Sequence, residues 1–400
     1  MEWKTVKIAD IGDVYSGGTP SSMESSYWNG SLPWLSSGET SQRYIYNTER
    51  SISEEGVKHS STRFAQKGSI VMASAGQGHT RGQVSMLCID TYVNQSVLVI
   101  KPDLRKIDPS FLFFNLDGRY NELRQLSDSA STRGSISGKI LKDLPINLPS
   151  LEDQHRIASI LSSLDDKIEN NNRINRNLEA QAQALFKSWF VNFEPWGGTM
   201  PEDWKEVSLN EMTSKFGTGL NPRKNFKLGE GENYYVTIKN MGNNRVYLDD
   251  RCDKVTDEAI EKINKRSKLQ AGDLLFSGIG TIGRVALVTE TPTNWNTSES
   301  VFNLHPANNI SSEFLYVLLL SDVFQNYVKV HAQGGVQQGI RMASLKDYKM
   351  YIPEDSKMKQ FDSHIIPIIT RIKNIDKEND RLATLRDTLL PKLMRGEITL

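Results

Sequence analysis

The chain has 400 residues and a mass of 45.2 kDa, with 48 basic and 48 acidic side chains and 38% hydrophobic residues. This length corresponds to about two to three domains, and the apolar content can fill cores, which excludes a wholly disordered chain. A formal net charge of +0 argues against a simple nucleic-acid-binding domain, because such domains usually carry a basic excess.

The start of the chain, its apolar segments and its cysteines indicate a cellular setting. No apolar run comes after the first residues, so we expect no secretory signal. The longest apolar patch, 314–320, is shorter than the ~18–20 residues that a membrane helix needs. Two cysteines, Cys88 and Cys252, exclude a disulfide framework and a four-thiolate zinc site. We expect a soluble, cytoplasmic protein in a reducing compartment, with no membrane contact and no bound metal.

The first 150 residues mix short strands with helices. The sequence predicts strands at 70–72, 84–89 and 97–100, and a helix at 109–116. The turns between them are rich in Gly, Ser, Thr and Asn. Loops of this kind on a rigid scaffold are where recognition usually occurs.

A long helix is predicted next, entered at Pro149 and ended by Pro195. From Ile157 its apolar residues recur at alternating steps of four and three, which is the a/d pattern of a coiled coil. A second globular part comes after it, with strands predicted at 234–238, 274–276, 285–288 and 301–304 and a helix at 312–320, and then a second long helix. The predicted seam of the two helices consists of Ile157, Leu161, Leu164, Ile168, Asn171, Asn175, Leu178, Leu185, Ile365, Ile368, Ile372, Ile375, Asn379, Leu382 and Leu389.

The chain contains two copies of one plan, because short motifs recur about 204 residues apart in the same order. The string at 67–72 returns at 271–276, and Leu141-Lys142-Asp143 returns as Leu345-Lys346-Asp347. Every seam position of the second helix lies 204 residues after one of the first. The alternative, two amphipathic helices lying each on its own half, is less consistent with a strict 3-4 seam. Antiparallel pairing is the simplest arrangement, and the seam asparagines would set its register.

We therefore predict an α+β fold with a pseudo-twofold duplication: two similar globular domains separated by two long antiparallel coiled-coil helices. The predicted boundaries are 1–150 for the first domain, 151–196 for the central helix, 197–353 for the second domain and 354–400 for the C-terminal helix.

The loops supply side chains that read base edges and hold phosphates in nucleic-acid complexes. Each of them could instead be an ordinary surface turn. The candidates are Ser36, Ser37, Gln77, His79, Thr80, Arg81, Ser131, Thr132, Arg133 and Ser135 in the first half, and Lys239, Asn240, Thr281, Arg284, Asn296, Thr297, Gln333, Gln337 and Gln338 in the second.

Enzyme motifs are incomplete. The run 278–283 fits G-x-G-x-x-G, but the segment after it is of β type, whereas a cofactor loop opens a helix. The six histidines are scattered, and neither a G-x-S-x-G elbow nor a phosphate-binding P-loop occurs in the sequence. We expect no catalytic residues and no cofactor of its own.

Several residues and segments spread over both globular parts and both helices form one pattern. They are Trp3 with Ile8, Trp204 with Leu209, and the segments 33–39, 68–70, 148–158, 160–168, 272–274 and 386–397. On these residues the whole chain resembles the specificity subunit of type I restriction–modification systems. The second half lacks the Gln-x-x-Ile-Ala string of the first helix, which weakens contacts carried over to the start of the second helix.

This resemblance implies a non-catalytic DNA-reading subunit. Each globular half would be a target recognition domain for one half of a split site on double-stranded DNA. The paired helices would be a spacer and a docking surface for two methyltransferase (M) subunits and, through them, the restriction (R) subunits. Adenine methylation and S-adenosylmethionine would belong to the partners.

Two other classes compete with this interpretation. A duplicated coiled-coil scaffold with two non-DNA binding modules explains the repeat and the helices but not the Gly/Ser/Thr/Arg loops. A self-sufficient methyltransferase lacks its cofactor loop. Residues 1–150 hold 16 basic and 15 acidic side chains and residues 200–350 hold 18 and 18, so neither half is basic. The positive charge must then gather on one face of each domain or come from partners, and we expect weak, salt-sensitive DNA binding by the chain alone.

Overall fold

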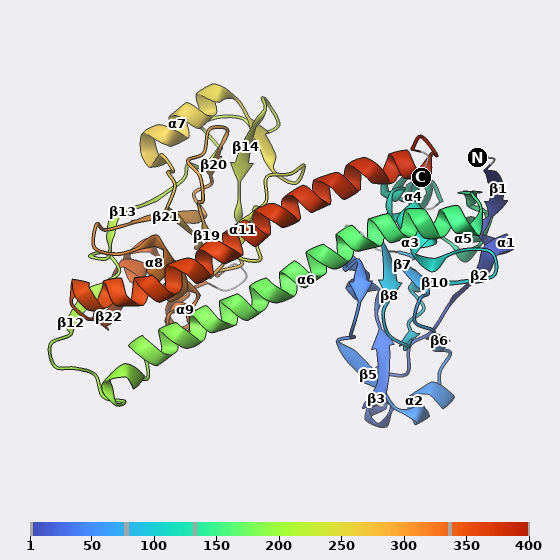
Figure 1. Cartoon of the computed structure of the whole chain (residues 1–400), viewed down its shortest axis with the longest axis horizontal. Coiled ribbons are helices and arrows are strands. Elements are labelled where there is room, and N and C mark those ends of the chain that lie inside the picture. The colour runs from blue at the N-terminus through green and yellow to red at the C-terminus, as the bar shows by residue number, and fades with distance from the viewer. Residues whose placement is uncertain (1–2, 76–79, 131–133, 335–337, 399–400) are drawn as a thin grey trace. The chain divides into compact units, whose positions relative to one another are not determined.

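The computed structural model describes residues 3–75, 80–130, 134–334 and 338–398. The chain forms two compact units. Unit 1 is Met1–Asn170 with Asn379–Leu400, and unit 2 is Asn171–Glu378. Each unit combines one globular part with segments of both long helices, α6 (Leu151–Phe190) and α11 (Asp355–Met394) (Figure 1).

The globular part of unit 1 is built on two sheets and a short strand pair. A five-stranded sheet has the order β2-β10-β7-β8-β4, and a four-stranded sheet has the order β5-β3-β9-β6. The bounds are β1 Lys4–Lys7 and β11 Pro145–Leu148, which pair with each other, then β2 Gly12–Ser16, β3 Trp28–Leu35, β4 Tyr44–Ile45, β5 Arg50–Ile52, β6 Arg63–Ala65, β7 Ile70–Ala73, β8 Val84–Leu87, β9 Thr91–Val93, β10 Val97–Pro102, and helices α1 Ile8–Ile11, α2 Glu54–Lys58, α3 Pro109–Asp117, α4 Tyr120–Ala130 and α5 Gly138–Asp143.

Unit 2 repeats this plan with a smaller main sheet, a smaller second sheet and an additional hairpin. Its main sheet has the order β13-β21-β18-β19, and a second sheet has the order β17-β14-β20. The bounds are β12 Lys205–Ser208 paired with β22 Lys349–Ile352, then β13 Thr213–Thr218, β14 Asn233–Val236, the hairpin β15 Met241–Gly242 and β16 Arg245–Val246, β17 Asp253–Val255, β18 Leu274–Ser277, β19 Val285–Leu287, β20 Trp295–Thr297, β21 Val301–Pro306, and helices α7 Asp257–Ser267, α8 Ser312–Leu320, α9 Asp322–His331 and α10 Met342–Lys346.

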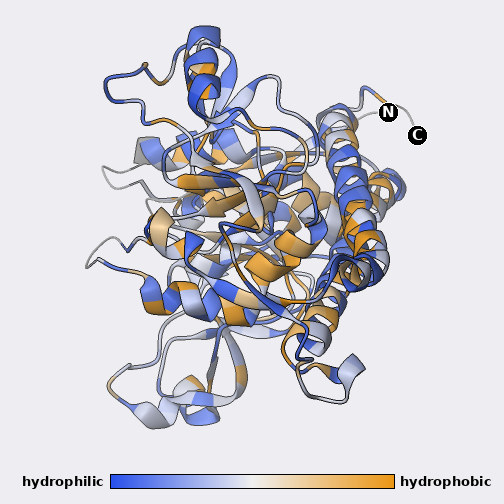
Figure 2. Cartoon of the chain, turned by 90° about the vertical axis from the view of Figure 1, so that its left-hand side faces the viewer, coloured by the Kyte–Doolittle hydropathy of each residue, from blue (hydrophilic) through white to orange (hydrophobic). Residues whose placement is uncertain are grey.

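The central strands are buried on both faces because alternate side chains enter two different cores. In β7, Ile70 and Met72 join the cluster around α3, whereas Val71 joins the cluster between the two sheets. In β18, Leu274 and Phe276 face α8, and Leu275 enters the other core. This is the period-2 alternation of a strand with two covered faces. Figure 2 shows apolar residues gathered inside the globular part and hydrophilic residues in its outer loops.

The long helices run antiparallel within each unit. In unit 1, Asp165 contacts Arg386, and Leu161 lies in one core cluster with Leu390 and Leu393. In unit 2, the Asn175 amide donates to Asp376 at 2.8 Å, and the Trp189 ring lies 5.5 Å from that of Phe361. Residue numbers rise along one helix where they fall along the other.

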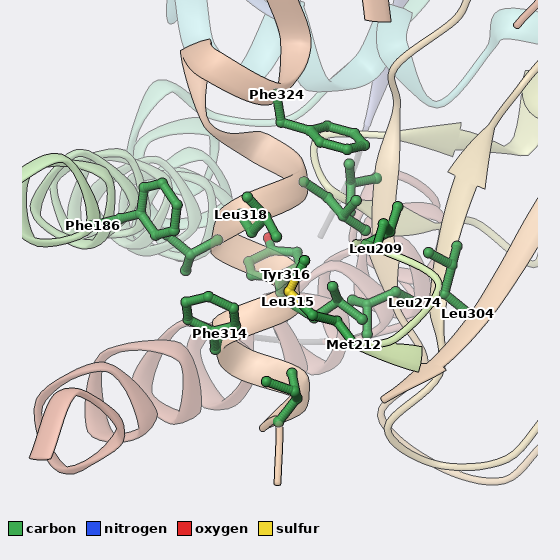
Figure 3. Close-up of a cluster of buried hydrophobic side chains, with 14 of the residues drawn as sticks. Phe186, Leu209, Met212, Leu274, Leu304, Phe314, Leu315, Tyr316, Leu318 and Phe324 are labelled. Carbon is green, nitrogen blue, oxygen red and sulfur yellow. The ribbon is translucent and has the colours of Figure 1, made fainter. Parts of the chain in front are cut away.

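Each helix also packs on a globular part. In unit 2, Phe186 of α6 points toward Phe314 and Leu318 of α8 (Figure 3). The buried face is therefore wider than a 3-4 seam, and it includes positions outside the predicted seam, such as Asp165, Phe186 and Ile369. All fifteen predicted seam side chains are buried or partly buried.

The predicted strands at 70–72, 84–89, 97–100, 234–238, 274–276, 285–288 and 301–304 correspond to β7, β8, β10, β14, β18, β19 and β21, with ends that differ by up to two residues. The helices predicted at 109–116 and 312–320 are confirmed as α3 and α8. Pro391 does not end α11, which continues to Met394. The shorter helices α1, α2, α4, α5, α7, α9 and α10 were not predicted, although α7 and α9 each bury apolar side chains along one face.

Candidate nucleic-acid interface

In unit 1 the structure brings together two of the loops singled out from the sequence. The Ile136 N–H donates to the Ser74 carbonyl at 2.7 Å, and Ala75 forms an antiparallel bridge with Ser135. The segment after β7 is thus joined to the segment before α5. The candidates Gln77, His79, Ser131, Thr132 and Arg133 lie in these two loops but outside the described residues.

Unit 2 has the same arrangement 204 residues later. The Ile340 N–H donates to the Gly278 carbonyl at 2.9 Å, and Ile279 bridges Gly339. The Gly280 N–H donates to the Gln338 carbonyl at 2.8 Å. Gln337 lies outside the described residues. The repeat found in the sequence is therefore also a repeat of hydrogen bonds between loops.

Several candidates remain accessible in these loops. Lys239, Thr281, Gln333 and Gln338 are exposed, and Thr80 and Ser135 are partly exposed. Ser36 and Ser37 are half-buried at a short 3₁₀ turn, where the Ser36 hydroxyl and N–H both donate to the Glu39 carboxylate at 2.9 Å.

Four candidates are buried, and their placement does not support a direct contact with DNA. Asn296 and Thr297 are 0% exposed, and the Asn296 amide donates to Asn264 Oδ1 and to the Ser267 carbonyl. Asn240 is 1% exposed, and its Oδ1 accepts from the Thr237 N–H at 2.9 Å. Arg81 is 6% exposed and is ion-paired with Asp128. Each of the four makes hydrogen bonds or an ion pair within the fold, although Asn240 Nδ2 is buried without a hydrogen-bond partner among the described residues.

Arg284 also has a structural role. Its guanidinium Nη1 donates to the carbonyls of Ile238 and Met241 at 2.8 and 2.6 Å. These carbonyls belong to the turn that carries Lys239, so Arg284 fixes that turn. A sequence pattern gives the residue type but not which way the donor points.

The glycine-rich run 278–283 lies between two antiparallel strands. It comes after β18 and precedes β19, and these strands pair Phe276 with Val285. Gly283 has φ +90°, and a Cβ at Gly278 would lie 2.5 Å from the Phe302 ring. The glycines are therefore explained by a tight turn and close packing, as the sequence indicated.

A buried ionic cluster in unit 1 was missed from the sequence. The Asp165 side chain is 4% exposed and accepts from Tyr44 Oη at 2.6 Å, Arg386 Nη1 at 2.7 Å and Arg43 Nη2 at 3.0 Å. Arg43 also pairs with Asp117 at 2.6 Å. Burial alone would raise the pKa of Asp165, but Arg43, Tyr44 and Arg386 outweigh it and hold that pKa below its usual range.

The corresponding place in unit 2 is apolar. Ile369 lies 204 residues after Asp165, and Ala182 lies 204 residues before Arg386. Both are 2% exposed and belong to one hydrophobic cluster. The two halves therefore share a backbone plan but hold their helices by different chemistry.

These features define a duplicated recognition protein, with one loop-bearing domain and parts of two long helices in each unit. The model of the type I restriction modification DNA specificity domain matches residues 1–180 and again 201–386. The chain belongs to this family.

Relatives span nearly the full chain. The MjaIX specificity subunit of Methanocaldococcus jannaschii is 26% identical over 415 residues, covering 99% of this chain and 94% of the relative. The HindI specificity subunit of Haemophilus influenzae is 26% identical, covering 83% and 87%. The crystal structure of a type I S subunit from M. genitalium matches with a TM-score of 0.57 and 18% identity, covering 98% of this chain and 96% of that one, and it supports the fold. Within the described ranges, no helix combines the length and apolar character that a membrane crossing requires.

Proposed function

We propose that this chain selects the DNA site of a type I restriction–modification complex, with each globular half reading one half of a bipartite sequence. The observation that carries the proposal is the repeated loop pair. The Ser74–Ile136 hydrogen bond in one half and the Gly278–Ile340 bond in the other place two loops together at the same position of the fold. Each half of a split DNA site would be read by one such loop pair.

The long helices suit a spacer. A helix of 40 residues is about 60 Å long, whereas half-sites one DNA turn apart are separated by roughly 34–36 Å. We propose that the paired helices set the number of unread base pairs, and that their outer faces bind two methyltransferase subunits. In this proposal S-adenosylmethionine, methylation and cleavage belong to the partner subunits, and the complex works in the cytoplasm of a prokaryotic cell.

A co-expression experiment tests the function. The full chain is purified alone and with its methyltransferase subunits, and each preparation is assayed for retention of duplex DNA and for adenine methylation. We expect weak, salt-sensitive retention by the chain alone, since its halves are neutral, and methylation at one bipartite sequence by the complex.

Two results would contradict the proposal. Methylation without sequence preference in the presence of the chain would remove its role in site selection. Absence of DNA retention in both preparations, with the methyltransferase subunits still bound to the helices, would favour the duplicated scaffold with non-DNA modules.

A further inference from the structure

The neutral charge of each half leaves open where DNA phosphates would be held. In unit 1, cationic side chains gather beside β2 in a cavity of about 500 Å³, which lies outside the loops predicted to read DNA. Arg63, Lys101 and Lys142 line this cavity, together with one acidic side chain, Asp13. We call Arg63, Lys101 and Lys142 the first edge patch.

The charges of the first edge patch are available. The side chains of Lys101 and Lys142 are exposed, and within the described residues neither side chain makes a hydrogen bond or an ion pair. The Arg63 guanidinium lies 4.1 Å from the centre of the Tyr15 ring, and the Tyr15 hydroxyl donates to the Phe64 carbonyl at 2.8 Å. The ring is held in place and in turn orients the guanidinium, so this cation is preorganised for an anion.

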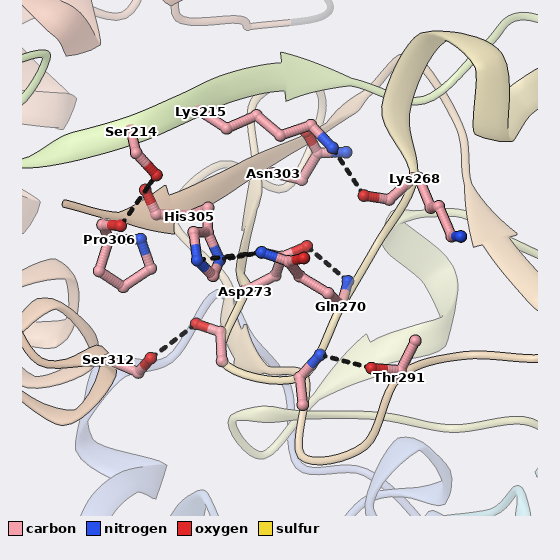
Figure 4. Close-up of polar contacts among 12 residues, drawn as sticks. Ser214, Lys215, Lys268, Gln270, Asp273, Thr291, Asn303, His305, Pro306 and Ser312 are labelled. Carbon is pink, nitrogen blue, oxygen red and sulfur yellow. Dashed lines mark hydrogen bonds and ion pairs between the residues drawn. The ribbon is translucent and has the colours of Figure 1, made fainter. Parts of the chain in front are cut away.

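Unit 2 carries a similar group at the corresponding edge. Lys346 lies 204 residues after Lys142, and its Nζ is 5.5 Å from the ring centre of Phe216. Phe216 pairs with Leu304 and so stands where unit 1 has Val14, which pairs with Ile100, on the opposite face of the strand from the position of Tyr15. Lys215 of β13 donates to the Lys268 carbonyl at 2.6 Å (Figure 4). We call Lys215, Lys268 and Lys346 the second edge patch.

One acidic group close to Lys215 is already engaged. Asp273 is 2% exposed and lies 2.7 Å from His305 Nδ1 (Figure 4). His305 stands where unit 1 has Lys101 and is the cross-strand partner of Lys215. Of the lysines in the second patch, Lys268 is exposed, and Lys215 and Lys346 are half-buried.

Both patches border an edge strand of the main sheet. β2 and β13 each pair on one side only, with β10 and β21. Backbone N–H groups on the open side of such a strand add to the attraction for an anion. The combination of exposed or partly exposed lysines, an oriented cation over a ring and an open strand edge suits phosphate oxygens.

The first edge patch lies apart from the reading loops along the strands. The loop after β7 begins beside Val97, since Val97 pairs with Ala73, whereas Lys101 pairs with Asp13 near the opposite end of β10. Four residues of strand separate the two places, roughly 13 Å. A group there can hold the DNA backbone without touching the bases that the loops read.

We propose that the two edge patches bind DNA phosphates without sequence preference, one patch in each recognition domain. This inference rests on the proposed function. DNA is favoured over an acidic protein because each patch belongs to a loop-bearing domain and not to the outer face of a long helix, and because the DNA backbone presents the same phosphate group to both copies. The patches supply the concentrated charge that the neutral totals conceal.

Salt titration of the full chain on a random-sequence duplex tests this role. Each phosphate contact contributes about 0.9 to the slope of log K against log salt. We expect Arg63→Ala/Lys101→Ala/Lys142→Ala to flatten that slope by about 2 to 3, and Lys215→Ala/Lys268→Ala/Lys346→Ala to do likewise. The combined variant should show the sum, and Lys101→Arg/Lys142→Arg should keep the original slope.

The matched control is Lys58→Ala/Arg105→Ala/Lys106→Ala. It removes the same charge from the same domain, but at cations paired with Glu55 or Asp103. If the control flattened the slope equally, the effect would come from net charge alone, and the proposed role of the patches would be overturned. If the edge-patch variants kept the original slope but no longer bound the methyltransferase subunits, the patches would bind an acidic protein instead of DNA. Absence of DNA binding by the unaltered chain, alone and in the complex, would instead overturn the proposed function.

Discussion

Asp165→Ala is expected to lower the free energy of unfolding of unit 1 by about 3–5 kcal/mol, because it removes a buried carboxylate that two partly buried guanidinium groups share. Arg43 retains Asp117, but Arg386 loses its contact on the globular side of α11. Chemical denaturation of the full chain measures the loss. Asp166→Ala is the matched control, since Asp166 is the exposed neighbour on the same helix turn and should change stability by no more than about 0.5 kcal/mol.

The same cluster predicts a pH dependence. The pKa of Asp165 is lowered in the folded chain, so its stabilisation is fully present above its unfolded pKa of about 3.9 and is lost as pH falls through the lower folded value. The unaltered chain should therefore lose more stability than Asp165→Ala does between pH 5 and that lower value. Parallel loss in both proteins would mean that folding does not lower the pKa of Asp165.

Lengthening both helices is expected to change the spacing of the DNA site and leave both half-sites intact. Inserting four residues at the middle of α6 and of α11 adds about 6 Å to each helix. At 3.4 Å per base pair, this corresponds to about two additional unread base pairs. Sequencing of methylated adenines in cells that express the complex measures the gap directly.

An insertion in α6 alone is the control for this experiment. It breaks the antiparallel register, in which Asn171 donates to Glu378 and Asn175 to Asp376, without lengthening the partner helix. We expect loss of methylation from that variant instead of a longer gap. Altered half-sites with an unchanged gap in the double insertion would remove the spacer role of the helices.

The duplication and the long helices could be predicted from the sequence because both are periodic. The 204-residue offset aligns Lys142 with Lys346 and every seam position with its counterpart, and the structure repeats it in the loop hydrogen bonds. Periodicity along one chain needs no knowledge of distant contacts, which is why these features were visible before the fold was known.

The chemistry that joins residues far apart could not be predicted in this way. Asp165 looks like a solvated helix residue until Arg43, 122 residues earlier, is placed beside it. Asn296 and Arg284 have the side chains of a DNA-reading residue, yet both bond to nearby backbone carbonyls of the fold. Composition likewise predicted no basic excess in either half. The positive charge of the edge patches becomes apparent only when residues far apart in the sequence are placed side by side in the fold.

The most direct test of the central claim is an exchange of one globular half. Residues 1–150 are replaced by the corresponding part of a relative with a different site, and methylated adenines are mapped across the genome. We expect that one half-site changes to that of the relative while the other half-site and the gap stay the same. Replacement of both half-sites, or of neither, would contradict the assignment of one half-site to each globular half.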